Sequence, residues 1–344
     1  MSGGYITAFQ ELEPYESKGS STVLRRPGRG NPPWLSDLLN YRKMKATKIL
    51  FICSTIILSS LFSNGAFGQG NFTTEPANAV FIKTDIANFW KAFDKIETEK
   101  NPFVDYLDKG TIGLKDFVPY RIESASNLLK TVKRRKEDYL ILRSRSDSLN
   151  KFDSIITTHY RTFKSIYPEA IFPPVYYVVG AFNAGGGVTQ NGLIIGTEVA
   201  KDDFDNIVYF VIHELIHFNQ KYDKKPIGKS TLLEQSIIEG SADFLASLTM
   251  KREYKVEYAE SRLDELCNEF VGIMYGSKYH GWLYGSKGKK EGRPNDLGYW
   301  MGYKITEAYY KASLDKSQAI VDILNIKDFK DFMIKSGYLN KWIK

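Results

Sequence analysis

The feature that most constrains this chain is the string VIHELIHFNQ at 211–220, which contains an HExxH motif formed by His213, Glu214 and His217. Residues four apart lie on one face of an α-helix, so the two imidazoles can bind a single metal ion. Glu214 then lies beside that ion, where its carboxylate can take a proton from an attacking water. Histidine is rare here, with 4 residues in 344, so the motif favours a metal-binding helix over two core histidines that happen to lie one turn apart.

Two histidines leave a zinc site one protein ligand short. The following string IIEGSADFLAS carries Glu239 and Asp243 four residues apart, on one face of a helix predicted over 231–250. Alone, the pair would be an ordinary solvated helix face, but its neighbours are largely apolar, so these acids need a partner. We expect Glu239 to be the third ligand and Asp243 to accept a proton from a ligating imidazole, which fixes the orientation of the ring.

The expected cofactor is one Zn²⁺ per chain, because two imidazoles and a carboxylate with an open position suit zinc, although cobalt or manganese would fit the same ligands. The predicted chemistry is hydrolysis of an amide by an activated water, with Glu214 as general base. The oxyanion needs a further donor, for which the candidates are His280 in KYHGWLYG and Tyr299 or Tyr303 in LGYWMGYK. The alternative for each of the three is a packing or surface role.

Hydrophobic periodicity predicts an α+β fold that is mainly helical, with a small β-sheet before the HExxH helix. The chain reads as one domain, with a helical N-terminal half over about 80–170 and a catalytic half over about 171–344. Strands are expected at 175–179 and 192–199, joined by a flexible turn in GAFNAGGG, and a loop rich in Gly, Tyr and Trp at 276–303. Helices are expected at 85–96, capped by Asp85, at 121–135, at 150–166, at 204–220 after a cap at Asp202–Asp203, and at 231–250, with mainly helix beyond 257.

The motifs together resemble a broad class of metallopeptidases and, within longer strings, one narrower family. HELIH followed by EGSAD is similar to the gluzincin arrangement, HExxH then ExxxD, of thermolysin-like metallopeptidases. Over roughly 85–335, the strings resemble the bacterial predicted zinc-dependent protease family catalogued as domain of unknown function 2268, with the gliding-motility lipoprotein B family as a relative. The strings are FVDYLDKGTIGLKDF, GAFNAGGG, NGLIIGTE, HELIHFNQ, EGSADF and PNDLGYWMGYKITEAYY.

The resemblance implies a gluzincin-type peptidase with a zincin-like fold. It implies His213, His217 and Glu239 as zinc ligands, Glu214 as general base and Asp243 behind a ligating histidine. It further implies that the element at 182–197 pairs with an extended peptide substrate. The residues Gly185, Gly186 and Gly187 would permit close backbone approach there, although a glycine-rich stretch can equally be a plain turn. A relative of the gliding family would also carry a lipidated cysteine after its signal, and this chain lacks one.

The N-terminal segment predicts export. Residues 44–68 hold a short basic stretch, an apolar run over 49–62 that is too short to span a bilayer comfortably, and small residues before Gln69, as in a cleaved signal peptide. We expect translation to begin at Met44, with 1–43 a non-native or disordered extension, and the protein to reach the periplasm or the medium without stable membrane insertion. The alternative is an uncleaved signal anchor in the inner membrane. Cleavage would leave Cys267 alone, without a disulfide.

Composition and charge exclude several classes of protein. With 43% apolar residues the chain can fill a core, which excludes disordered and disulfide-scaffold classes. The net charge is +7, and four of the excess positive charges precede residue 69, so the body has no electrostatic footprint for nucleic acid. The sequence therefore favours an exported zinc metallopeptidase acting on peptides or proteins. The alternatives are a zinc-binding partner-recognition protein with weak or lost catalysis, which intact Glu214 disfavours, and a zinc hydrolase of non-peptide amides. Nothing in the sequence indicates the oligomeric state.

Overall fold

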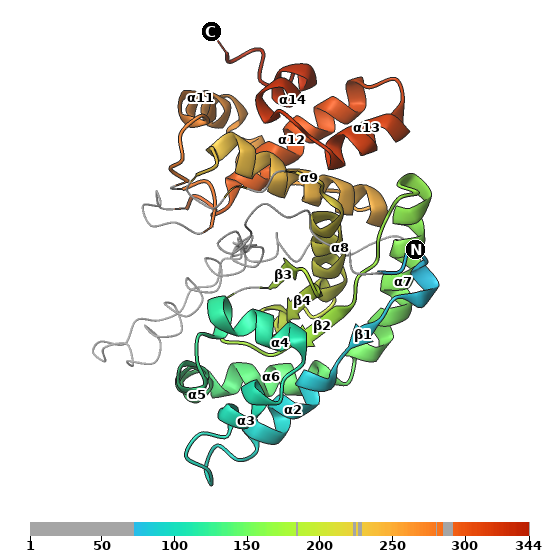
Figure 1. Cartoon of the computed structure of the whole chain (residues 1–344). Helices are drawn as coiled ribbons and strands as arrows, with labels where there is room; N and C mark the ends of the chain where they lie inside the picture. The colour runs from blue at the N-terminus through green and yellow to red at the C-terminus, as the bar shows by residue number, and fades with distance from the viewer. Residues whose placement is uncertain are drawn as a thin grey trace, which may run out of the picture.

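A four-stranded sheet lies beside the central helix in the computed structural model (Figure 1). Its spatial order is β1-β2-β4-β3, with β1 and β4 parallel to β2 and β3 antiparallel to β4 at the edge. Val175 pairs with Leu193 in the centre, where β2 and β4 are wholly buried, as β-branched and aromatic residues favour. The strands are β1 Phe81–Ile82, β2 Val175–Val178, β3 Gly186–Thr189 and β4 Gly192–Gly196.

The structure describes residues 72–183, 185–222, 225, 229–279, 281–284 and 292–343. The predicted extension at 1–43 and signal peptide at 44–68 lie outside these residues. Within them, no helix combines the length and apolar character that crossing a membrane requires.

The N-terminal helices cover one end of the sheet, drawn from blue to green in Figure 1. Their core is aromatic: the ring of Phe89 packs on Phe103, Tyr106 and Tyr139. Two hydroxyls then fix the chain just after β2, since Tyr106 donates to the carbonyl of Val179 at 2.9 Å and Tyr139 donates to that of Gly180 at 2.7 Å. The elements are 3₁₀ helix η3 Pro76–Asn78, α2 Thr84–Phe93, α3 Phe103–Asp108, α4 Ile112–Phe117, π-helical turn η4 Val118–Ile122, α5 Ala125–Arg134, α6 Lys136–Ser146 and α7 Leu149–Ile166.

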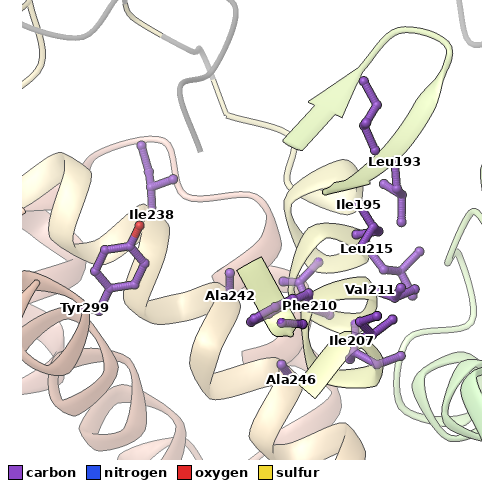
Figure 2. Close-up of a cluster of buried hydrophobic side chains, with 14 of the residues drawn as sticks. Leu193, Ile195, Ile207, Phe210, Val211, Leu215, Ile238, Ala242, Ala246 and Tyr299 are labelled. Carbon is purple, nitrogen blue, oxygen red and sulfur yellow. The ribbon is translucent and has the colours of Figure 1, made fainter. Parts of the chain in front are cut away.

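The C-terminal helices pack above the central helix α8, Asn206–Asn219, in orange and red in Figure 1. Helices α9, Leu232–Met250, and α12, Leu297–Ala312, cross closely because Gly240 and Gly302 have no side chain at the crossing. A Cβ on either glycine would overlap the backbone of the other helix. Figure 2 shows one face of α8 packed between β4 and α9. The other elements are η5 Thr197–Ala200, α10 Glu257–Glu260, α11 Leu263–Ile273, α13 Lys316–Leu324 and α14 Phe329–Ser336. The side chains that pack between β4, α8 and α9 include Leu193, Ile195, Ile207, Phe210, Val211, Leu215, Ala242 and Ala246.

The predicted α+β, mainly helical class is confirmed, as are the neighbouring strands before the motif helix. The stretch GAFNAGGG is not only a turn, because Gly186 begins the edge strand β3. Both predicted caps were wrong. Helix α2 has Lys83 at its N-cap, and Asp85 is buried in its first turn, accepting from the backbone and hydroxyl of Thr111. Helix α8 has Asp205 at its N-cap, without a side-chain cap hydrogen bond.

The predicted loop over 276–303 also ends earlier than expected. Helix α12 starts at Leu297, so Tyr299 and Tyr303 lie on a helix one turn apart. Asp296, in the left-handed region with φ of 64°, turns the chain into this helix.

Candidate metal centre

Three buried side chains converge where α8 and α9 cross. Nε2 of His217 lies 3.0 Å from Nε2 of His213 and 3.1 Å from Oε2 of Glu239, and the last two atoms are 3.6 Å apart. All three residues are at most 3% exposed. The two histidines share a face of α8 because they are four residues apart, and Glu239 approaches from the middle of α9.

The spacing of these three atoms fits one metal ion. The circle through them has a radius of about 1.9 Å, close to the zinc bond length of about 2.0–2.1 Å to histidine nitrogen and carboxylate oxygen. Two imidazoles and one carboxylate are also a donor set that zinc prefers. His213, His217 and Glu239 are thus a group that can hold a metal.

The outer nitrogens of both rings are fixed by partners. Nδ1 of His213 lies 2.7 Å from Oδ1 of Asp243, and Nδ1 of His217 lies 2.7 Å from Oε1 of Gln220. A carboxylate can only accept, and Gln220 donates its amide group to the carbonyl of Ile238, so each Nδ1 carries the proton. Each neutral ring then presents the lone pair of Nε2 to the centre, as a metal ligand must.

Electrostatics at the three atoms favour a positive charge between them. Burial raises the pKa of Glu239, but the charges of His217 and His213 and their hydrogen bonds outweigh burial and bring that pKa down to about 2. Burial lowers the pKa of His213, but hydrogen bonds with Asp243 and Glu239 outweigh it and raise that pKa to about 10. The anionic pocket therefore holds a proton tightly, and a metal ion would take the place of that proton.

Glu214 lies between the metal centre and the edge strand. A Cβ on Gly186 would lie 2.6 Å from Oε1 of Glu214, so β3 runs directly over this carboxylate. Its Oε2 is buried without a hydrogen-bond partner among the described residues. Burial raises the pKa of Glu214, and the charges of His213 and His217 oppose that rise. A buried carboxylate with one unused oxygen is suited to accepting a proton.

The other candidate residues fall in different places. The ring of Tyr299 lies 6.4 Å from that of His213, nearly parallel to it, so α12 brings this side chain to the centre. Tyr303 lies one turn further on and stacks on Tyr254 at 4.2 Å, away from the ligand atoms. His280 lies outside the described residues.

The three glycines differ in the space around them. Gly185 accepts from the N–H of Gly196 at the start of the hairpin, and Gly186 covers Glu214. Gly187 has open space where a Cβ would be.

Sequence reasoning missed four residues around the centre. Gln220 stands three positions after His217 in the motif string, where its spacing could have suggested a partner for the ring. Tyr209 donates to Oδ1 of Asp243 at 2.5 Å. The hydroxyl of Tyr284 donates to Oε1 of Gln235 at 2.7 Å and lies 3.3 Å from Oε1 of Glu239, which leaves Oε2 of Glu239 for the metal. Arg121, from the N-terminal half, is buried near the same centre, and no local signal marks it.

Comparison with known proteins agrees with this geometry. Residues 176–330 match the family described as predicted Zn-dependent protease, domain of unknown function 2268. Searches of curated proteins and of solved structures find no significant match. The matched segment contains β4, α8, α9 and α12, and with them both histidines and Glu239. Over residues 176–330, the chain is therefore similar to the predicted Zn-dependent protease family.

Proposed function

We propose that this protein is a zinc metallopeptidase that hydrolyses peptide bonds, with one zinc ion per chain. The observation that carries the proposal is the meeting of three ligand atoms with a separate buried carboxylate. His213, His217 and Glu239 place their donor atoms within 3.6 Å of one another, and Glu214 keeps one oxygen unused beside them. A structural zinc site has no need of such a base and usually closes with a fourth side-chain ligand.

The chain's own residues divide the work of hydrolysis. When bound, zinc would supply Lewis-acid chemistry, polarising a substrate carbonyl and lowering the pKa of a water. Glu214 accepts the proton of the attacking water and then gives it to the leaving amine. Asp243 and Gln220 hold the two imidazoles in the orientation that ligation requires.

The edge strand β3 is the element proposed to orient the substrate. It pairs with β4 on one side only, and it covers Glu214 at Gly186. An extended peptide can add to such an edge through main-chain hydrogen bonds, which orients the scissile bond without demanding one sequence. The proposed substrates are therefore peptides or unfolded protein segments, and no nucleic acid.

We also propose that the protein is exported. The support is the basic, apolar and small-residue order of 44–68, which is typical of a signal peptide. In this proposal the mature chain begins at Gln69 and is a single metallopeptidase domain. N-terminal sequencing of the secreted protein tests it, and a mature start before Met44 would contradict it.

The test of the catalytic proposal is Glu214→Gln beside Glu257→Gln, an exposed carboxylate on α10. Each protein is assayed with a fluorogenic peptide library and analysed for zinc. Glu214→Gln should keep its zinc and lose at least about 99% of turnover, since a general base contributes about 10²- to 10⁴-fold, while Glu257→Gln should match the parent. Full turnover in Glu214→Gln would refute its role, and a zinc-loaded parent that cleaves no peptide would refute the proposed function.

A further inference from the structure

The N-terminal half delivers one charged side chain to the metal centre. Arg121 lies on η4, is 7% exposed, and precedes the segment that matches the protease family. Its carbonyl accepts from the side chain of Asn183 at 2.6 Å, which ties η4 to the chain that leads into β3. The turn closes tightly behind it, where Glu123 has a φ of 68° and donates its N–H to Val118.

The guanidinium of Arg121 lies near groups from four other elements. Its charge interacts with Glu214 of α8, Tyr299 of α12, Glu239 of α9 and Tyr284 of the segment before α12. Glu239 is itself a ligand, and Glu214 lies under Gly186, three residues after the Asn183 to which η4 is tied. The buried Arg121 therefore lies beside the metal centre, near the strand that covers Glu214.

The negative charge near Arg121 moves from Glu214 to the substrate during hydrolysis. Burial lowers the pKa of Arg121, while the nearby carboxylates of Glu214 and Glu239 oppose that change, and a guanidinium stays protonated in proteins. When Glu214 takes a proton from water, its own negative charge disappears, and a negative charge develops on the carbonyl oxygen of the substrate. A fixed cation beside both groups loses its attraction to Glu214 and gains a stronger one to the new oxyanion, to which it can donate directly. This exchange needs no reorganisation, which is the condition for electrostatic catalysis.

We propose that Arg121 is a catalytic residue that donates a hydrogen bond to the carbonyl oxygen of the scissile peptide bond as that oxygen becomes negative. The proposal rests on the proposed peptidase function and assigns to the N-terminal half a part in the active site. Arg121, rather than a lone tyrosine or histidine, is then the main source of oxyanion stabilisation. No bond to Arg121 forms or breaks, and the proton stays on the guanidinium.

The experiment compares Arg121→Met and Arg121→Lys with Arg145→Met, which removes an arginine whose guanidinium donates to the carbonyl of Asp202. Each full-length protein is analysed for zinc and thermal stability. kcat and KM are then measured on a peptide that the parent cleaves, made with a free and with an amidated C-terminus. Calorimetry measures the affinity for the phosphinic analogue of that peptide, whose anionic PO₂ group resembles the tetrahedral intermediate.

Arg121→Met should keep its zinc, lose about 10²- to 10³-fold in kcat on both peptides, and change KM little. It should bind the phosphinic analogue more weakly by a similar factor. Arg121→Lys, which keeps a charge but not its geometry, should fall between, and Arg145→Met should match the parent.

Three results would overturn the proposal. An unchanged kcat in Arg121→Met, or a KM that rises only for the free-acid peptide, would make Arg121 dispensable or an anchor for the terminal carboxylate. Equal loss of zinc and stability in Arg121→Met and Arg121→Lys would make its role structural. A zinc-loaded parent that cleaves nothing would remove the proposed function and this inference with it, whereas the first two results leave the peptidase intact.

Discussion

Replacing Gly186 by alanine should damage catalysis through a single methyl group. The added Cβ would lie 2.6 Å from Oε1 and 2.9 Å from Cγ of Glu214, well inside van der Waals contact. The backbone at Gly186 does not have a positive φ, so alanine is not excluded by conformation. The strain must therefore be relieved by movement of the Glu214 side chain or of β3.

The size of the effect follows from that overlap. Clearing the contact requires a displacement of roughly 0.5–1 Å, and a misplacement of about 1 Å at a reacting group costs about 10²-fold in rate. Overpacking typically costs about 1–3 kcal/mol of stability. Gly186→Ala should therefore lower kcat about 100-fold and reduce the melting temperature by several degrees, while the zinc content stays unchanged because the ligands lie on α8 and α9.

A glycine outside the metal centre supplies the control. A Cβ on Gly272 of α11 meets nothing within 4 Å, so Gly272→Ala should keep full activity on the same fluorogenic peptide library. Zinc analysis and thermal melting on both variants separate catalysis from folding. Wild-type kcat in Gly186→Ala, or equal losses in the two variants, would refute the placement of β3 over Glu214.

Three further outcomes follow from other contacts. Gln220→Ala removes the partner of His217 Nδ1 and should weaken zinc binding about 10- to 100-fold; unchanged affinity in a chelator competition would contradict this. Burial raises the pKa of Glu198 to about 7, so the folded state binds more protons than the unfolded state between about pH 4.5 and 7. The free energy of unfolding should therefore fall by up to about 3 kcal/mol as pH rises through that window, and denaturant titrations of Glu198→Gln should lack this component; identical pH profiles would count against it. Gly302→Ala should destabilise strongly because its Cβ overlaps the backbone of α9, whereas Gly272→Ala on α11, with open space around it, should gain up to about 1 kcal/mol; equal melting temperatures would contradict the close crossing.

The metal centre is the part of the molecule that the sequence predicts best. The four-residue spacing of His213 and His217 and that of Glu239 and Asp243 are local properties of a helix, so they can be read without tertiary structure. Apolar neighbours around each pair indicate that both helices are buried. The structure brings the two pairs together at the crossing of α8 and α9.

The missed features depend on contacts between distant segments. Strand β3 contains consecutive glycines, which have low strand propensity, and it exists because β4 offers a partner. Asp85 has the chemistry of a helix cap, yet Thr111 from another helix captures its carboxylate inside the first turn. Arg121 reaches the centre from nearly a hundred positions before the motif, on a π-helical turn without a sequence signature.

The proposed function depends on the binding of one zinc ion by His213, His217 and Glu239. Elemental mass spectrometry on the purified full-length protein beside Glu239→Ala measures that binding, with circular dichroism to confirm that both proteins are folded. We expect close to one zinc per chain in the parent and much less in the variant, because removing Glu239 leaves only two ligands. A well-folded parent without zinc, or a variant with an undiminished content, would contradict it.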